Sequence, residues 1–286
     1  MKPQHVLSGA NRADGAHAAT DSYDPAHFAP LFAVEDRHFW FRARAQLIAT
    51  LMRQTVGALP PGYRVLEVGC GTGQVLRVLE RVCSRGVVMG MDLFIEGLRF
   101  ARRRVDVPLV QGDIHAPPFV VGFDVIGLFD VLEHLPDDRA VLQDICAMLS
   151  PSGVLILTVP AHQSLWSYFD EAAHHCRRYE PEDLMNKLVA AGFEVEYLSP
   201  FMSLLLPLIW VGRRLVSLRL RRDTKTMTAD TIDVNSRAQE EFRIVPIVNS
   251  VLTGLLRTES VWAKHRRRLP GGTSLIAIAR KKGLST

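Results

Sequence analysis

The stretch Val65-Leu66-Glu67-Val68-Gly69-Cys70-Gly71-Thr72-Gly73 decides the fold of this 286-residue chain. Its first half has the apolar composition of a buried β-strand, and its second half places a glycine at every second position. Apolar residues at helical spacing follow from Val75 to Val82. The stretch therefore predicts a strand, a tight glycine loop and a helix N-terminus, which present backbone N–H groups and a positive dipole end to a ligand.

An acidic residue at the end of the next strand supports this interpretation. The loop is one residue shorter than the dinucleotide fingerprint G-x-G-x-x-G, and alone it is also compatible with a plain glycine turn. Residues 86–92 have the composition of a strand, and Asp92 ends it 19 residues after Gly73. An acid at about this distance holds ribose hydroxyls in nucleotide-binding folds. The two linked signals predict a nucleoside-containing cofactor.

Strand and helix patterns alternate along the chain, which predicts an α/β fold with a parallel sheet and helices on both faces. Strands are expected near 64–69, 87–92, 107–111, 123–129 and 153–159. Helices are expected near 73–84, 94–104 and 138–149. A further helix at 180–191 and strands at 193–199 and 273–280 complete the pattern.

Four segments resemble motifs of class I S-adenosylmethionine (SAM) methyltransferases. The first is the glycine loop, similar to VLDxGCGTG, and the others are residues 110–113, 123–134 and 149–157. The resemblance implies a Rossmann-like seven-stranded sheet of order 3-2-1-4-5-7-6 with strand seven antiparallel. It also implies SAM as cofactor and S-adenosylhomocysteine as product. The chain is most similar to the quinone-biosynthesis type, in a bacterial subset with H-F-W-F-R (38–42) and H-x-R-R-Y (175–179).

The resemblance assigns the cofactor to residues at the carboxyl ends of strands. Glu67 is expected to hold the methionine amino group, Asp92 the ribose hydroxyls and Asp113 the adenine amino group, although a turn-forming Asp113 is the alternative. An arginine of the N-terminal segment, taken as Arg42, is expected at the SAM carboxylate, although spacing alone does not decide which arginine. The full predicted set is Glu67, Gly69, Gly71, Gly73, Asp92, Leu93, Asp113, Ile114, Phe129, Asp130 and Arg42.

Residues 166–179 follow the fifth strand and are expected to lie over the pocket, where loops commonly carry function. Methyl transfer to oxygen benefits from a general base, and histidine is suited to that function at neutral pH. His175 is the first candidate, with Asp170 to orient it, and His134 is the second. Expected acceptor contacts are Trp40, Trp166, Arg178 and Tyr179. The alternatives are a loop latched by Arg–carboxylate pairs and a His134 that only orders its loop.

The residues after the fourth strand bear on the acceptor. They lack the N/D-P-P-Y/F motif of methyltransferases acting on amino groups, which favours oxygen or carbon acceptors. No acidic triad of the catechol type is evident, so no metal is expected. The sequence predicts O-methylation of a small, partly apolar molecule, as in secondary metabolism. A membrane-surface enzyme acting on a lipid or lipid-linked glycan and a non-catalytic SAM-binding scaffold are the alternatives.

We expect five regions: a disordered tail (1–24), a helical lid (25–60), the SAM-binding core (61–199), a helical insertion (200–270) and the final strand with its tail (271–286). Residues 198–212 carry no charge but are too short for a membrane span, which needs roughly 20 apolar residues. Between 200 and 225, six Lys or Arg face one Asp, a local charge of +5 against +4 for the whole chain. The segment 200–222 is therefore a lid, a homodimer contact or an interfacial membrane helix.

Composition sets broader limits. Hydrophobic residues make up 48% of the chain, enough for a packed core. The four cysteines form no C-x-x-C pair and no zinc set, and no secretory signal is visible, which predicts a cytoplasmic protein, with membrane association left open. The basic residues lack interleaved aromatics, so no nucleic-acid partner is expected.

Overall fold

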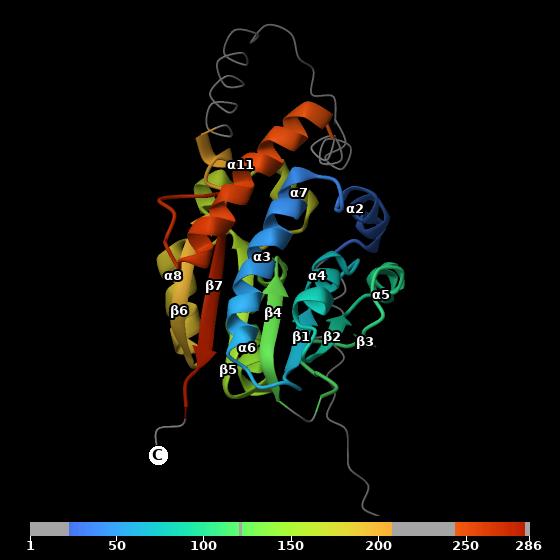
Figure 1. Cartoon of the computed structure of the whole chain (residues 1–286), viewed down its shortest axis with the longest axis vertical. Helices are drawn as coiled ribbons and strands as arrows, with labels where there is room; N and C mark the ends of the chain where they lie inside the picture. The colour runs from blue at the N-terminus through green and yellow to red at the C-terminus, as the bar shows by residue number, and fades with distance from the viewer. Residues whose placement is uncertain (1–22, 120–121, 208–243, 284–286) are drawn as a thin grey trace, which may run out of the picture.

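A computed structural model describes residues 23–119, 122–207 and 244–283, and within it seven strands form one sheet of order β3-β2-β1-β4-β5-β7-β6 (Figure 1). The bounds are β1 (Arg64–Val68), β2 (Val87–Asp92), β3 (Leu109–Gln111), β4 (Phe123–Phe129), β5 (Leu149–Pro160), β6 (Phe193–Phe201) and β7 (Ser274–Lys281). All neighbouring pairs are parallel except those of β7, which is antiparallel to β5 and β6. The predicted fold class and strand order are confirmed.

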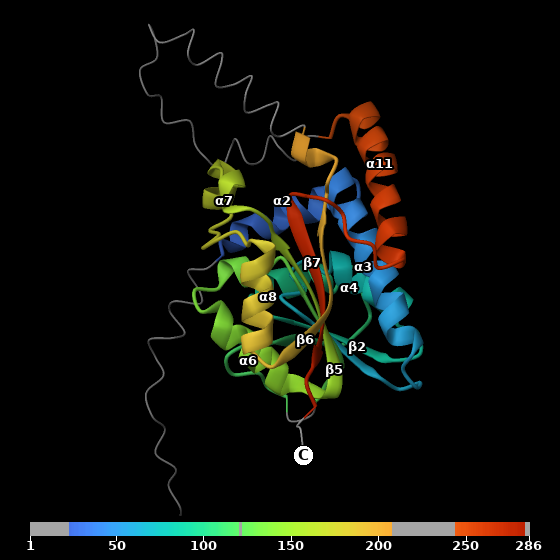
Figure 2. The ribbon, with the colours of Figure 1, turned by 90° about the vertical axis from the view of Figure 1, so that its left-hand side faces the viewer.

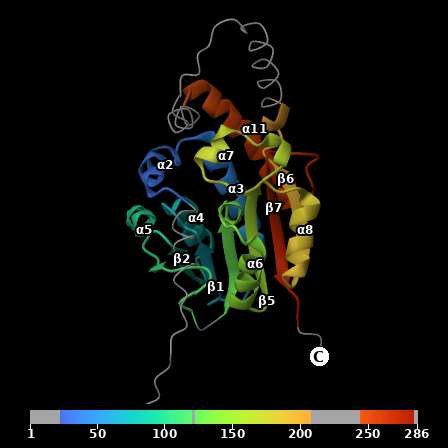
Figure 3. The same ribbon diagram turned by 180° about the vertical axis from the view of Figure 1, so that it is seen from behind.

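Helices cover both faces of the sheet (Figure 2). The face with α3 (Phe39–Gly57), α4 (Gln74–Val82) and α11 (Pro246–Lys264) is seen in Figure 1, and the opposite face with α6 (Asp138–Met148) and α8 (Pro181–Ala190) in Figure 3. The remaining elements are α2 (Phe28–Val34), α5 (Ile95–Ala101), α7 (Tyr168–Ala172) and three short 3-10 helices, Pro25–His27, Leu132–His134 and Gln163–Leu165.

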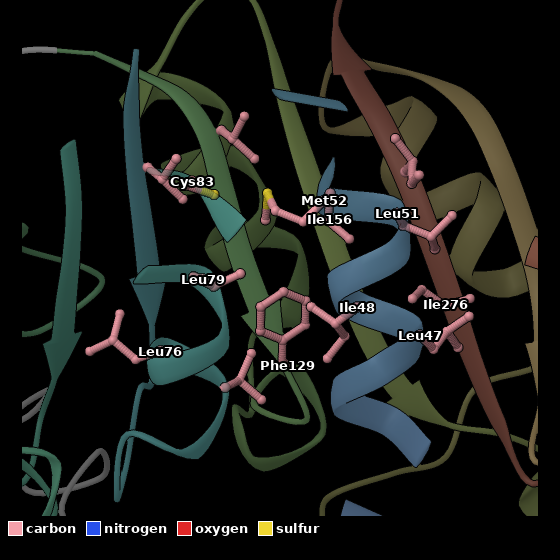
Figure 4. Close-up of a cluster of buried hydrophobic side chains, with 14 of the residues drawn as sticks. Leu47, Ile48, Leu51, Met52, Leu76, Leu79, Cys83, Phe129, Ile156 and Ile276 are labelled. Atoms are coloured by element: carbon pink, nitrogen blue, oxygen red, sulfur yellow. The ribbon is translucent and has the colours of Figure 1, made fainter. Parts of the chain in front are cut away.

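The core has two halves because successive side chains of a strand point to opposite faces. In β1, Val65 packs toward α3 and α4, whereas Leu66 packs toward α6 and α8. Figure 4 shows the first half, in which Ile48 of α3 lies beside Phe129 and Leu47 and Leu51 lie toward Ile276 of β7. Burying each such side chain contributes roughly 1.5–3 kcal/mol. The sheet is thereby held as a rigid frame whose carboxyl edges carry the loops.

The segment 25–60, expected as a lid, contains two kinds of structure. α2 lies beside α5 and contributes to the cavity described below, whereas α3 is a long core helix with ten buried residues. α3 packs along α11, which belongs to the segment expected as an insertion. The N-terminal segment therefore contains one helix that lines the cavity and one that belongs to the core, and its function as a lid stays a prediction.

The expected insertion is described only in part. β6 extends to Phe201, Leu205 packs against the core, and α11 follows the gap between 207 and 244. Most of the segment 200–222, and nearly all of the expected tail 1–24, lie outside the described residues. None of the helices in the described ranges is long and apolar enough to cross a membrane.

Candidate active site

A cavity of about 1130 Å³ lies at the carboxyl ends of β1, β2, β4 and β5. α2 and the start of α3 contribute one wall. Residues 165–178, which include α7 and are called the α7 segment below, contribute another. Of the predicted site residues, the lining includes Trp40, Glu67, Gly69, Gly71, Asp92, Leu93, Asp113, Ile114, Phe129, Asp130, His134, Trp166, His175 and Arg178. The fold thus brings residues from six separate segments of sequence to one space.

The glycine loop is shaped by positive φ angles at Gly69, Gly71 and Gly73. A Cβ at Gly69 would lie 2.4 Å from the Val131 side chain, so only glycine fits between the loop and the β4 edge. Gly73 does not line the cavity; its Cβ would meet Ala101 at 2.9 Å. Gly73 was predicted to contact the cofactor. The structure instead gives it a packing function, because this glycine lets α4 approach α5.

Asp92 fixes the loop to the end of β2. Its carboxylate accepts hydrogen bonds from the backbone N–H of Gly71 (2.7 Å) and of Phe94 (2.9 Å). Burial raises the pKa of Asp92 to about 6, although these N–H groups act to lower it. A carboxylate held here, beside the glycine loop, is placed to accept hydroxyl donors from a ligand.

Glu67 and Arg44 are two ionisable residues of the cavity that interact with each other. The Glu67 carboxyl is buried, and its Oε2 has no hydrogen-bond partner among the described residues. Burial raises its pKa well above the usual range, while Arg44 acts to lower it. Arg44 itself forms an ion pair with Asp130 and lies over the Trp40 ring. Arg42 does not line the cavity, whereas Arg44, two residues further along α3, does.

These features fit SAM. An orphaned buried acceptor at Glu67 suits an ammonium group, the glycine loop leaves room for close backbone approach, and Asp92 suits ribose hydroxyls. Asp113 and Ile114 also line the cavity, and Asp113 accepts the His115 N–H at 2.9 Å. Asp113 therefore forms a turn and lines the cavity at once, and its contact with adenine stays a prediction.

An aromatic group at the cavity wall was not predicted. Tyr23 contacts the rings of Phe28, Phe94 and His134, with centroids 5.0–6.1 Å apart. Burial raises the pKa of Tyr23, so its hydroxyl stays protonated. Tyr23 falls in the segment interpreted as a disordered tail, and no periodicity marks it.

The α7 segment brings His175 to the cavity and holds it from behind. His175 Nδ1 lies 2.9 Å from Asp170 Oδ1, which also accepts from Arg178 Nε at 2.7 Å. Asp170 is fully buried; burial acts to raise its pKa, but the hydrogen bonds from His175 and Arg178 outweigh this and lower it to about 2. Asp170 does not line the cavity, so its predicted orienting position is present while direct contact with an acceptor is not.

His134 lies beside His175, with ring centroids 4.8 Å apart. Burial, helped by the neighbouring His175, lowers the pKa of His134 to about 3, so this ring stays neutral. Glu133 is buried next to it with Oε2 unpartnered among the described residues, and burial raises its pKa. Glu133, His134 and His175 each offer a ligand atom within 4.8 Å of the others, a donor set able to hold a metal ion that the sequence did not lead us to expect.

Tyr179 is the predicted acceptor contact that the structure places elsewhere. Its side chain is fully buried and its hydroxyl donates to Asp138 Oδ2 at 2.9 Å, on the α6 side of the sheet. Burial and the neighbouring Asp138 raise its pKa. Tyr179 is therefore a framework residue, because the last residue of H-x-R-R-Y turns inward toward the core beside Leu132 and away from the cavity.

Residues 37–198, more than half of the chain, match the family described as methyltransferase domain. The chain belongs to this methyltransferase family. Similar proteins include the ubiquinone biosynthesis O-methyltransferase of Idiomarina loihiensis, 27% identical over 46% of this chain and 62% of that protein. The trans-aconitate 2-methyltransferase of Azoarcus is 30% identical over 44% and 48%, respectively. The methyltransferase thus spans about half to two thirds of these relatives.

Solved structures agree on the fold. A phosphoethanolamine N-methyltransferase of Haemonchus contortus, bound to S-adenosylhomocysteine, aligns with a TM-score of 0.51, 19% identity, 83% of this chain and 52% of that one. The chain carries a SAM-dependent methyltransferase domain with a Rossmann-like sheet, as its sequence motifs predicted.

Proposed function

We propose that the enzyme transfers the SAM methyl group to an oxygen of a small, partly apolar acceptor, with His175 as the general base. The observation that carries this proposal is the Asp170–His175 pair at the wall of the cavity that also holds the glycine loop. SAM supplies a methyl group already activated on a sulfonium. The protein's contribution is to align the acceptor, exclude water and take a proton.

The hydrogen bond to Asp170 supports a defined state of His175. A proton on Nδ1 is held by the Asp170 carboxylate, which leaves the Nε2 lone pair available. A hydroxyl of the acceptor that donates to Nε2 transfers its proton there as the C–O bond forms and the C–S bond breaks. Aromatic and aliphatic lining from Phe39, Trp40, Leu165 and Trp166 suits an acceptor with an apolar portion.

The relatives support an oxygen acceptor but do not identify this one. One relative is named an O-methyltransferase of ubiquinone biosynthesis, and another a trans-aconitate 2-methyltransferase. All four cysteines are free, which suits a reducing compartment such as the cytoplasm. A place in secondary metabolism is compatible with both features.

The test is methyl transfer from isotopically labelled SAM to a panel of phenols, catechols, hydroxy acids and carboxylic acids. S-adenosylhomocysteine release measures turnover, and mass spectrometry with chemical degradation locates the methyl group. Oxygen-methylated product supports the proposal, whereas methyl on carbon or nitrogen contradicts it. No turnover with any class, despite SAM binding, would favour the scaffold alternative.

A chelator distinguishes two uses of the same histidine. A metal on Glu133, His134 and His175 would occupy the Nε2 atom that a general base needs, so the two functions exclude each other. Activity that survives exhaustive treatment with EDTA supports the general base. Activity that is lost with EDTA and restored by one divalent cation would contradict the general base. It would favour a mechanism in which a metal ion binds and activates the acceptor oxygen.

A lipid or lipid-linked acceptor is the second candidate function. The described observation in its favour is the apolar surface of α11, since the charged segment 200–222 lies mostly outside the described residues. A membrane extract offered as acceptor, with the product partitioned between solvent and water, tests it directly.

A further inference from the structure

Helix α11 is oriented opposite to the usual rule for a surface helix. Its buried face, against α3, is mostly polar or small: Asn249, Thr253, Leu256, Glu259, Ser260 and Ala263. Its outward face is apolar and exposed: Ile247, Val248, Val251, Leu255, Val261 and Trp262. With the N-cap residue Val245, this stretch contributes seven of the twelve large hydrophobic residues that are exposed in the described chain. So dense a patch marks an interaction surface.

The outward face has the layout of an interfacial helix. At 3.6 residues per turn, the six apolar residues fall within an arc of roughly 140°. Arg257 and Lys264 stand seven residues apart and therefore lie together along one border of that arc. Long basic side chains at such a border extend their charges toward phosphate groups while the apolar side chains are buried.

The exposed charge that the structure describes on α11 and on residues 265–268 is entirely positive. The only acid of α11 is Glu259, which is buried and accepts the backbone N–H groups of Met202 (2.7 Å) and Ser203 (2.8 Å). Just beyond the helix, His265, Arg267 and Arg268 are exposed. Such a surface complements an anionic partner, and a second copy of the same face would bring like charges together without an acid to pair them.

We propose that the outward face of α11 docks this methyltransferase on an anionic lipid bilayer. Val251 and Leu255 enter the boundary between headgroups and acyl chains, Trp262 lies at that boundary, and Arg257 and Lys264 contact lipid phosphates. The chain leaves the described structure at 207 and returns at 244, next to this face, and the intervening sequence contains five arginines between 213 and 222. The bilayer is favoured over a protein partner because residues 208–222 of that sequence combine apolar and basic residues without an acid, as this face does. This inference holds whatever the acceptor is.

The docked helix would lie beside the entrance wall of the active site. Asn249, at the end of the first turn of α11, accepts the Phe39 N–H at 2.7 Å and donates to the Arg37 carbonyl at 2.9 Å. Phe39 lines the cavity, and this end of α11 extends past the edge of the sheet (Figure 2). An acceptor dissolved in the bilayer would therefore meet the enzyme near the cavity wall formed by the start of α3.

The test is flotation of the full chain with phosphatidylcholine vesicles, with and without phosphatidylglycerol. We expect binding to the anionic vesicles that weakens as salt is raised. The double variant Val251→Gln, Leu255→Gln should lower vesicle affinity at least about tenfold, and Arg257→Gln, Lys264→Gln should remove the preference for phosphatidylglycerol. Val189→Gln, at an exposed apolar position on α8, is the matched control and should bind as the parent does. All variants change exposed residues, so unchanged thermal unfolding serves as the check on folding.

Three results would overturn the proposal. The intact chain fails to float with anionic vesicles. The Val251→Gln, Leu255→Gln variant floats as well as the parent, which would move docking to another segment such as 208–222. In the third result, light scattering shows that the parent is a dimer and the Val251→Gln, Leu255→Gln variant a monomer, and neither binds vesicles. The face would then be a contact between two copies.

Discussion

The Asp92 carboxylate holds the glycine loop by accepting the Gly71 N–H, and it also lines the cavity. Its pKa is raised from 3.8 to about 6 by burial. A carboxylate accepts ribose hydroxyls best when ionised, so SAM affinity should fall as pH drops below about 6. Isothermal titration between pH 5 and 8 measures this.

The Asp92→Asn variant isolates the contribution of this carboxyl. Its SAM affinity should be at least about tenfold weaker at pH 7.5, in line with loss of charge-assisted hydrogen bonds worth roughly 1.5–3 kcal/mol each. Its affinity should also lose the pH dependence near 6. If that dependence persists in Asp92→Asn, another group, such as Glu67, is responsible for it.

His175 offers a second test at the scale of one side chain. His175→Gln keeps a donor for Asp170 but removes the basic nitrogen, so kcat should drop about 10²- to 10⁴-fold with SAM affinity unchanged. His162→Gln is the matched control, because His162 pairs with Glu180 and does not line the cavity. An unaltered kcat in His175→Gln would exclude this residue as the base.

Residues that follow strand ends were predictable as neighbours, because parallel strands place them at one edge of the sheet. The structure puts Glu67, Asp92 and His175 at one cavity, as expected, and their functions stay predictions. Tyr179 and Arg42 were misplaced because the direction of a side chain within a loop or along a helix depends on tertiary packing. Arg44 differs from Arg42 by two positions, which on a helix means a different face. No sequence pattern marked Tyr23 as a residue of the cavity.

At the scale of elements, Gly73 controls how α4 approaches α5. Gly73 has φ of 79°, and an added Cβ would lie 2.9 Å from Ala101. Gly73→Ala should cost about 1–2 kcal/mol of unfolding free energy for the left-handed backbone alone, with the contact adding to it. Gly254→Ala, in α11 with no atom within 4 Å of the new Cβ, should be neutral or stabilising by up to about 1 kcal/mol. Denaturant unfolding measures the free energy of unfolding of both variants. Equal changes in that free energy would contradict the special position of Gly73.

The α7 segment is latched by Asp170, whose pKa is lowered from 3.8 to about 2. The carboxylate therefore contributes stability above about pH 4, roughly 2 kcal/mol, and that contribution is lost as pH falls through about 2. Asp170→Asn should be less stable than the parent at pH 7, and the gap should narrow progressively below pH 4. Urea unfolding at pH 7 and pH 3 measures it; a gap that stays constant would show that the effect is not electrostatic.

The order of strands and helices was predictable from the sequence. The spacing of apolar residues differs between strands and helices, and segments of the two kinds alternate along the chain. The predicted strand at 87–92 and helix at 138–149 agree with β2 and α6 to within one residue. β5 begins at Leu149, four residues before its predicted start, because the turn before it pairs with Phe123. The position of α11 was not predictable, since its polar buried face inverts the pattern that places a helix on a core.

At the scale of the whole molecule, Asn249 connects segments 210 residues apart. Its amide bridges the Phe39 N–H and the Arg37 carbonyl, and so fixes the start of α3 to α11. Asn249→Ala leaves a half-buried N–H without its acceptor, which should cost about 1–3 kcal/mol. We expect faster proteolytic cleavage around 35–40 and a SAM KM raised several-fold, because Phe39 lines the cavity.

Asn249→Asp separates the two bonds of this bridge. It keeps an acceptor for Phe39 and loses the donor to Arg37, so its defect should lie between those of the parent and Asn249→Ala. Thr258→Ala, on the exposed side of the same helix, should leave proteolysis and KM unchanged. If Asn249→Ala were destabilised with an unaltered SAM KM, α11 would support the fold without supporting the cavity. A SAM KM that rises in proportion to the rate of proteolytic cleavage would show that the Asn249 contact couples α11 to the cavity.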